Sequence, residues 1–436
     1  MKKIFIQLTI LTFFAMANAY ASEKKNAPDS PNSLTIRNAP RIGIKNGNFV
    51  NSETGGKFTP RGFNYARLHK GWHSTFGRKT YEPERAEKML RDLHTNGFNI
   101  VRVFVDQLIE NGIVESKKSE SLSSVYMSNI CDFLKRAAKN NVYVVFTFPM
   151  LPQSKQYSEL FDKERPDIRG INQIYLTRGA IKAKAKYLSD FVRWIKNKNP
   201  ELLPAVFSYE LCNEAAMVVD LPPFSLKKGF IIPANGKKYD LSSDKDLQKM
   251  IDDHTLLWVY NCVKQVKKID PLTLISANVF TYKAVYRTTA GRILADESVD
   301  VRFPLRALAL AQSKIDYLDI HLYPLKSSSI KEDLDSIEWE KTLKECKKNG
   351  KPVMLGEFGF FRENQTNITA TVDALKHVAV QARENGFQGF MYWTYDTDEQ
   401  KRIWNGKSEN GEIMEALKKI KFSAHGSHRT TRKNTK

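Results

Sequence analysis

The sequence predicts an α/β fold, a single closed (β/α)8 barrel of the TIM-barrel type with a small N-terminal hairpin. From residue 58 onward, amphipathic charged stretches alternate with short apolar runs, which is the pattern of parallel βα units. Gly, Asn or Pro stops stand between them, as in HTNG before FNIVRVFV and KKNGK before PVMLGEF. Eight such runs can be identified, and eight βα units close a barrel.

The first predicted element is the hairpin, in the segment IGIKNGNFVNSETGGKF. Asn46-Gly47 and Gly55-Gly56 suit tight turns, and we expect the hairpin to close the bottom of the barrel. The eight predicted strands follow at residues 58–64, 98–105, 142–148, 205–212, 272–278, 315–322, 352–358 and 387–394.

The predicted helices lie between these strands and end at the stops. Their ranges are 82–95, 122–140, 177–197, 246–268, 331–348, 369–384 and 411–420. A less regular fifth helix is expected within 290–313. Residues 218–245, rich in Gly, Pro and Lys, are expected to form a surface loop after the fourth strand.

A doubly wound sheet has the same alternation of strands and helices, so the position of polar residues decides between the two folds. A barrel gathers its chemistry at the carboxyl ends of many strands. A nucleotide-binding sheet has a Gly-rich phosphate loop, and neither GxGxxG nor GK[ST] occurs here. The predicted strand ends carry Asn64, Arg102, Asn213, Glu214, His321, Tyr323, Glu357 and Trp393.

The termini differ in composition from the barrel. Residues 1–21 combine a Lys pair, an apolar stretch and Ala19-Tyr20-Ala21, the pattern of a cleaved secretory signal. We therefore expect a secreted protein, with periplasmic and extracellular destinations both open. Residues 22–40 are expected to form a flexible lead-in, 41–420 the catalytic barrel, and 421–436 a basic disordered tail. After removal of the signal, no membrane association is expected.

Charge and cysteine content limit the possible partners and cofactors. The net charge is +20, yet no nucleic-acid signature of interleaved aromatic and basic residues occurs, so no nucleic-acid partner is predicted. The four cysteines are scattered and form no CxxC pair, which predicts buried free thiols and leaves one disulfide possible. No HExxH motif occurs, and we predict a monomer without metal or cofactor.

Two glutamates at strand ends are the best indication of function. Glu214 ends VFSYELCNE, and Glu357 lies in PVMLGEFG. An ionised carboxylate inside a buried run costs several kcal/mol, whereas the open end of a strand exposes it to solvent and substrate. Many buried acids are structural, but two such ends on strands four and seven face each other across a barrel. Cleavage of a glycosidic bond requires such a pair.

Four motifs together resemble one enzyme family. Asn213-Glu214, IHLYP, GEFG and MYWT end strands four, six, seven and eight, as in clan A retaining glycoside hydrolases, and family five, the cellulase and β-mannanase family, is the best match. The resemblance spans residues 58–418. It implies that Glu214 is the general acid/base and Glu357 the nucleophile of a double displacement.

The resemblance also implies roles for neighbouring residues. Arg102 would hold Glu357 ionised, although a structural ion pair inside the barrel is the alternative. Asn213 would bind the sugar 2-hydroxyl or simply cap the strand end. His321 and Tyr323 would line the reactive subsite, with Tyr323 near Glu357.

Aromatic and amide side chains complete the predicted binding site. Trp393 would be the platform under the reactive sugar ring, and Asn64 and Trp72 would also contact substrate. Further subsites, or ordinary loop packing, are the two interpretations of Tyr65, Tyr81, Tyr395 and Trp404.

The predicted activity is endo-hydrolysis of a β-1,4-linked mannan or glucan. The alternatives are an exo-acting β-glucosidase or β-mannosidase and a catalytically silent carbohydrate-binding barrel. Two positions depart from the family pattern. Thr147-Phe148-Pro149-Met150 stands where many members have His, and Ala215 stands where most have Pro. The resemblance therefore does not extend to a specificity subgroup.

Overall fold

The structure is a computed structural model that describes residues 39–421, except 70–71, 110, 162–164, 297, 325–328 and 336–337. The predicted leader, nearly all of the lead-in and most of the basic tail lie outside the described residues. In the described part, no helix has the length and hydropathy that a bilayer crossing requires.

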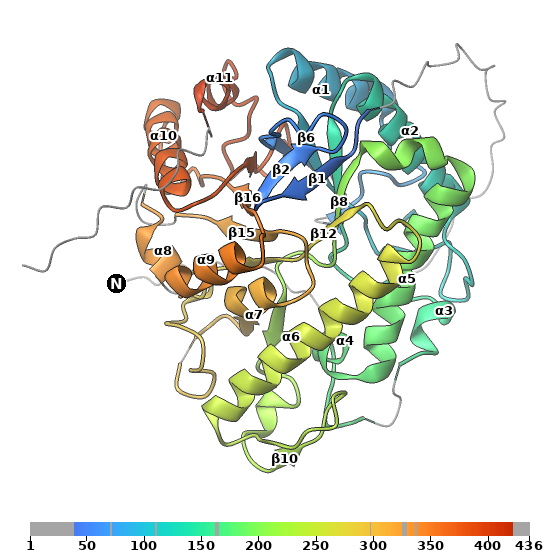
Figure 1. Ribbon diagram of the computed structural model, residues 1–436, viewed down its shortest axis with the longest axis vertical. Helices are drawn as coiled ribbons and strands as arrows, with labels where there is room; N and C mark the ends of the chain where they lie inside the picture. The colour runs from blue at the N-terminus through green and yellow to red at the C-terminus, as the bar shows by residue number, and fades with distance from the viewer. Residues whose placement is uncertain are drawn as a thin grey trace, which may run out of the picture. The chain divides into compact units, whose positions relative to one another are not determined.

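A ring of parallel strands forms the centre of the fold (Figure 1). Neighbours around the ring follow the order β12-β8-β7-β6-β3-β17-β16-β15-β13. Only Ala277 separates β12 from β13, so these are two halves of the fifth strand, and one half pairs with β8 while the other pairs with β15. The ring therefore closes with eight strands, which confirms the predicted barrel. The segments are β3 (Arg61–Tyr65), β6 (Ile100–Phe104), β7 (Tyr143–Thr147), β8 (Val206–Glu210), β12 (Leu274–Ser276), β13 (Asn278–Phe280), β15 (Leu318–Leu322), β16 (Val353–Phe358) and β17 (Phe390–Tyr392).

Helices follow the strands, and four of them begin at a residue whose side chain caps the first turn. Ser123, Thr177, Ser243 and Asn367 each accept a hydrogen bond from a first-turn backbone N–H. The main helices are α1 (Pro83–Thr95), α2 (Ser124–Lys139), α5 (Arg178–Lys198), α6 (Asp244–Lys267), α7 (Ala307–Gln312), α9 (Trp339–Lys348), α10 (Ile368–Glu384) and α11 (Glu412–Lys419). Shorter ones are α3 (Lys155–Ser158), α4 (Asn172–Leu176) and α8 (Lys331–Asp335).

The fourth and fifth βα units differ from the prediction. Within 290–313 only α7 is helical, and Arg302–Pro304 form β14, because Pro304 lacks the N–H that a helix interior needs. The insertion after strand four is not a plain loop. Within residues 218–245, β10 (Phe230–Ile231) pairs with β11 (Tyr239–Asp240), and β9 (Ala216–Val218), which ends where this segment begins, pairs with β14.

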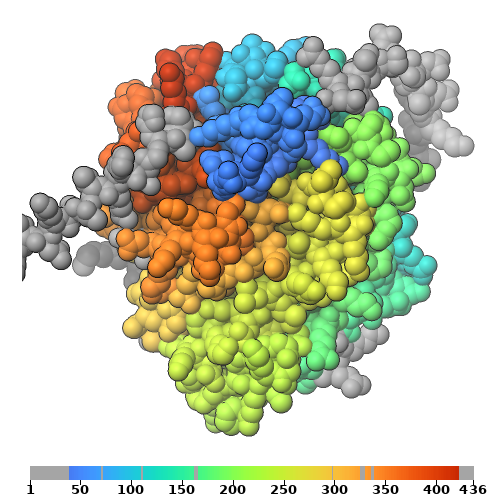
Figure 2. Space-filling model, viewed as in Figure 1, coloured from blue at the N-terminus to red at the C-terminus, as the bar shows by residue number. Residues whose placement is uncertain are grey.

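The hairpin closes one end of the barrel, as predicted. It consists of β1 (Ile42–Lys45) and β2 (Asn48–Asn51), and positive φ angles at Asn46 and Gly47 suit its tight turn. Phe49 is buried, with its ring 5.3 Å from that of Phe207 and 5.4 Å from that of Tyr317. Figure 1 shows the hairpin in front of the strands, and in Figure 2 it is the blue surface at this end.

All four cysteines, at positions 131, 212, 262 and 346, are buried and free. This confirms the prediction of buried thiols, and no disulfide is present in the described part of the chain.

Candidate active site

Arg102 organises the carboxyl ends of the strands. It projects from β6 and is fully buried. Burial alone lowers the pKa of Arg102, but the charges of Glu210 and Glu357 raise it above its ordinary value, so the guanidinium stays charged. Its nitrogens donate to Glu210 Oε2 at 2.7 Å, Asn64 Oδ1 and Glu357 Oε2 at 2.8 Å each, Asn213 Oδ1 at 2.7 Å and Thr147 Oγ1 at 3.3 Å.

Glu357 lies on β16 and has a partner for each carboxylate oxygen. Tyr323 Oη donates to Oε1 at 2.6 Å, and Arg102 donates to Oε2. Burial raises the pKa of Glu357, and the charge of Glu214 adds to this, while His321, Arg102 and Tyr323 oppose it. The net pKa lies above its ordinary value. The carboxylate is fixed in orientation, as a nucleophile requires.

Glu214 follows β8 by four residues and adopts a left-handed φ of 51°. Its backbone N–H donates to Asn278 Oδ1 at 2.5 Å, which holds this unusual turn. The side chain keeps 23% exposure, and its Oε2 lies 3.8 Å from Arg302 Nη1. Burial raises the pKa of Glu214, but the His321 hydrogen bond and the charges of His321 and Arg302 outweigh this, so the pKa lies below its ordinary value.

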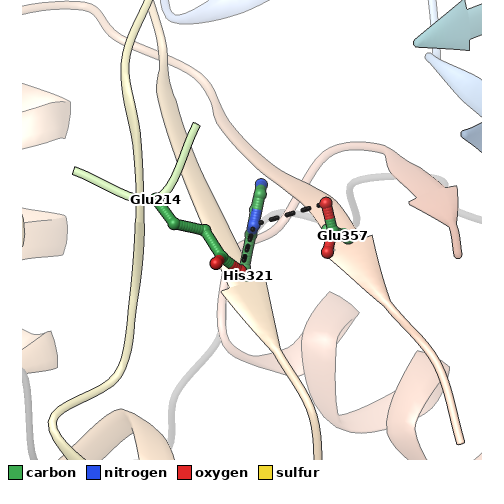
Figure 3. A group of neighbouring side chains, drawn as sticks. All are labelled: Glu214, His321 and Glu357. Atoms are coloured by element: carbon green, nitrogen blue, oxygen red, sulfur yellow. Dashed lines mark hydrogen bonds and ion pairs between the residues drawn. The ribbon is translucent and has the colours of Figure 1, made fainter. Parts of the chain in front are cut away.

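His321, on β15, lies between the two glutamates (Figure 3). Its Nδ1 is 3.2 Å from Glu214 Oε1 and 3.6 Å from Glu357 Oε2. One carboxylate oxygen of each glutamate and this nitrogen all lie within 4.8 Å of one another. The same three side chains have donor atoms suited to a divalent metal. However, Arg102 pairs with Glu357 and Arg302 lies beside Glu214, and repulsion from these two positive charges disfavours a bound cation.

An aromatic wall borders the glutamate pair. Trp393 is buried, and its Nε1 donates to Gln400 Oε1 at 2.7 Å. Its ring meets Phe104 edge-on at 5.6 Å, and His73 stacks on Phe104 at 3.7 Å. Burial and the charge of Arg102 lower the pKa of His73 to about 3, so its imidazole is neutral.

The remaining predicted residues occupy different environments. Asn64 is fully buried and donates to Gly356 O at 3.1 Å, so it lies behind the site. Trp72 lies on β5 (Trp72–His73), which pairs with β4 (Leu68–His69), and its side chain is 48% exposed. Their contacts with substrate remain predictions. Of the further aromatic residues, three are packed in the main core, as the packing alternative proposed: Tyr65, Tyr395 and Trp404.

Sequence reasoning missed several side chains around the glutamates. Glu210 and Asp319 lie inside strands that read as apolar, and a charged residue within such a run was the available signal. Arg302 and His73 come from segments outside the barrel strands, so only the fold brings them to the site. Asn278 likewise gave no distinct signal in the sequence.

The sequence matches one known protein family. The sequence model of the family described as cellulase (glycosyl hydrolase family 5) matches residues 52–399. A comparison with curated protein sequences finds no match.

Solved structures with the same fold include three enzymes. An endo-β-1,4-mannanase from Thermotoga petrophila has a TM-score of 0.55 at 14% identity, covering 84% of this chain and 77% of that one. A family 5 mannosidase from Rhizomucor miehei has a TM-score of 0.53 at 14% identity, covering 88% and 97%. An exo-β-1,4-mannosidase from Opitutaceae bacterium strain TAV5 has a TM-score of 0.53 at 15% identity, covering 87% and 58%. At such identities the likeness concerns the fold.

Proposed function

The chain belongs to glycosyl hydrolase family 5 and is therefore a glycosidase, and on this premise we propose an exported, retaining enzyme that cleaves β-1,4-linked mannan or glucan within the chain. The proposal extends the family membership to a mechanism, a substrate class and a destination. Each of these has its own support and its own test.

The observation that carries the mechanism is the short separation of the glutamates. Oxygens of Glu214 and Glu357 lie within 4.8 Å of each other and of His321 Nδ1. Retaining glycosidases have carboxyl groups about 5–5.5 Å apart, whereas inverting enzymes need about 6.5–9.5 Å to admit a water molecule. The arrangement therefore supports a double displacement.

In the first step, Glu357 attacks the anomeric carbon while Glu214 protonates the departing glycosidic oxygen. Arg102 and Tyr323 hold the attacking carboxylate in place. In the second step, Glu214 takes a proton from a water molecule whose oxygen attacks the anomeric carbon, and the new C–O bond displaces the Glu357 carboxylate. Glu214 is the more exposed of the two carboxyl groups, which suits a residue that exchanges protons with water.

The pKa shifts of the two glutamates run against these roles. Glu214 must be protonated to act as the acid, yet its pKa is lowered, and Glu357 must be ionised, yet its pKa is raised. The reactive form is thus a minor one before substrate binds, and the pair titrates as a unit. We expect a bell-shaped dependence of kcat/KM on pH, measured with the cleaved glycan.

The proposed substrate class is a neutral β-1,4-glycan. The wall of Trp393, Phe104 and His73 offers an aromatic edge and a neutral hydrogen-bonding ring to a pyranose. The similar folds named above belong to mannanases and mannosidases, so mannan comes first among the substrates to test.

Exo-action is the second candidate, because a strand that pairs with the start of the insertion lies against the acid. Arg302 of β14 is 3.8 Å from Glu214, and β14 pairs with β9, at whose last residue the insertion begins. A segment so close to the reacting bond could block one end of a cleft. Product length decides between the two modes, since endo-cleavage lowers the viscosity of a polymer early and exo-cleavage releases short sugars first.

The test is product formation from mannan, glucomannan, a cellulose derivative, mixed-linkage glucan, xylan and aryl β-glycosides. The wild type should cleave a β-1,4-glycan, and Glu357→Gln should abolish cleavage while retaining binding. Glu345→Gln, a change at a partly buried residue on the outer helix α9, is the matched control and should remain active. Sugar binding without turnover, unaltered in Glu357→Gln, would instead favour a silent binding barrel.

Export has a separate test. N-terminal sequencing of the protein recovered outside the cytoplasm should begin at Ser22, if residues 1–21 are removed as the leader pattern predicts. Recovery of an intact Met1 in the cytoplasmic fraction would contradict export and leave the proposed chemistry untouched.

A further inference from the structure

Two more carboxyl groups lie beneath the catalytic pair. Glu210 belongs to β8 and Asp319 to β15, two residues before His321. Both have 0% exposure. Burying an acid costs free energy unless the group is neutralised or hydrogen-bonded. The contacts of Glu210 and Asp319 must therefore offset this cost.

Each of these groups has one oxygen with good partners. Glu210 Oε2 accepts from Arg102 Nε at 2.7 Å and from Asn278 Nδ2 at 3.0 Å. Asp319 Oδ1 accepts from the Gly356 backbone N–H at 2.8 Å. A Cβ at position 356 would lie only 2.0 Å from that oxygen, so glycine permits the close approach beside Glu357.

The other two oxygens have no such partner. Among the described residues, Glu210 Oε1 and Asp319 Oδ2 are buried and receive no donor from an N–H group or a hydroxyl. Asn278 donates to Glu210 and is the register partner of Asp319 on the neighbouring strand, which places the two carboxyl groups close together inside the ring. A hydrogen bond between their free oxygens would satisfy both. Two ionised carboxylates offer only acceptors, so this bond requires a proton on one of them.

The surrounding charges indicate where that proton resides. The groups that face Asp319 are Glu210 from β8, Arg102 from β6 and the Gly356 N–H from β16, and the buried Tyr317 precedes Asp319 by two residues. Arg102 touches Glu210 and Glu357 directly, and no ion pair of Asp319 occurs in the described part of the chain. Burial and the charge of Glu210 both raise the pKa of Asp319 well above its ordinary value.

We propose that Asp319 is a protonated carboxylic acid at working pH and that its hydroxyl donates to Glu210 Oε1, so that the two groups together carry one negative charge. Glu210 is then held against Arg102 Nε, and Arg102 Nη1 remains for Glu357. Asp319 acts through Arg102 and the Gly356 backbone and is a positioning residue. The predicted effect of Asp319 on turnover rests on the proposed function, whereas the protonation of Asp319 does not depend on it.

Infrared difference spectroscopy tests the proton without any substrate. A protonated carboxyl group has a C=O band distinct from the bands of a carboxylate. Subtracting the spectrum of Asp319→Asn from that of the wild type at neutral pH should leave the band of a protonated acid. If the difference contains only carboxylate bands, Asp319 is ionised and the proposal is wrong.

Substitutions test the role in turnover. In Asp319→Asn, the amide can donate to Glu210 Oε1 and accept from Gly356, so kcat/KM should stay within about threefold of wild type. Asp319→Ala leaves Glu210 Oε1 without a donor and should lower kcat/KM roughly tenfold. Equal losses in both variants would contradict a neutral, hydrogen-bonding Asp319.

The double variant distinguishes a shared charge from two separate contacts. In Glu210→Gln, Asp319 can lose its proton and supply the missing negative charge to Arg102. Glu210→Gln/Asp319→Asn has no such replacement, so its kcat/KM should fall at least tenfold below the product of the single effects. Multiplicative effects would contradict the shared charge. If the double variant does not fold, or if no substrate is found, the infrared result decides.

Discussion

At the residue scale, Glu357 is held by donors on both oxygens. Tyr323 approaches Oε1 and Arg102 approaches Oε2, so rotation of the carboxylate would break at least one of two short bonds. Hydrogen bonds to charged groups contribute about 1.5–3 kcal/mol each. The orientation of the proposed nucleophile is therefore set before substrate binds.

Tyr323→Phe removes one of these donors and keeps the ring. We expect kcat/KM to fall roughly 10- to 100-fold, as the loss of about 1.5–3 kcal/mol implies. Tyr260→Phe, on the exposed face of α6, is the control and should leave kcat/KM unchanged. An unchanged kcat/KM in Tyr323→Phe would show that the bond has no role in the reaction.

Asp106 predicts a pH dependence of stability. Burial raises the pKa of Asp106 to about 7, against the N–H of Leu108, which donates to Oδ1. The folded protein keeps this proton up to about pH 7, whereas the unfolded chain loses it near pH 4. The folded state binds more protons between these values, so this group's contribution to stability is lost as the pH rises through that window.

Asp106→Asn removes the titration. Relative to wild type, the free energy of unfolding of the variant should therefore increase from about pH 4 to pH 7, by at most roughly 4 kcal/mol. Urea unfolding at several pH values measures this difference. Parallel curves for the two proteins would mean that Asp106 has no raised pKa.

Single residues were predictable from sequence when their position in a pattern was unusual. Glu214 and Glu357 could be found because a carboxylate ends an apolar run, and the Asn213-Glu214 pair strengthened the inference. Glu210 and Asp319 were hidden because the pattern describes a buried strand and says nothing about which charges neutralise each other inside a ring. Such pairs depend on neighbours more than 100 residues apart in the chain.

At the element scale, the hairpin β1–β2 plugs the end of the barrel opposite the glutamates. Phe49 contacts Phe207 and Tyr317, both at the amino ends of barrel strands. This position separates stability from chemistry, since Phe49 packs in an apolar cluster that includes none of the described side chains named around Glu357.

Phe49→Ala should lower the free energy of unfolding by about 3–5 kcal/mol, because it leaves a cavity among aromatic rings. Phe230→Ala, with a side chain 65% exposed on β10, is the control and should change stability little. Urea unfolding measures both. At a temperature where Phe49→Ala is folded, its kcat should match wild type, and a lost kcat in folded protein would contradict the separation.

Elements were predictable where the pattern was regular. Gly, Asn or Pro stops preceded six of the eight predicted strands, because a stop fixes where a helix must end, and the apolar runs themselves indicated the other two. The structure of the fifth unit was not predictable. Arg302–Pro304 is a strand because it pairs with β9, which lies 84 residues away at the nearest pair. Local propensity in RALALAQS could only indicate the short α7.

At the scale of the whole molecule, the net charge of +20 affects encounter with charged substrates. We expect kcat/KM for a neutral glycan to be constant between about 0.01 and 0.15 M salt. An anionic derivative of the same glycan should be cleaved faster at the lower salt concentration, because screening is weaker there. Equal salt dependence for both would mean that the charge does not steer substrate.

The whole fold and the family were predictable because both depend on the order of elements along the chain. That order consists of eight βα units and four strand-end motifs. Substrate choice was not predictable, because it depends on the shape of loops such as the insertion after β8, and sequence patterns predict loop conformation poorly. Arg302 lies beside Glu214 because β14 pairs with β9, and no local sequence pattern predicts that pairing.

The central claim is that Glu357 forms a covalent bond with the sugar. Incubation with a 2-deoxy-2-fluoro glycoside of the cleaved sugar, carrying a good leaving group, should trap that intermediate, because the fluorine slows its hydrolysis more than its formation. Mass spectrometry of the digested protein should then place one sugar on the peptide that contains Glu357. An active enzyme that acquires no label, or acquires it on Glu214, would contradict the account.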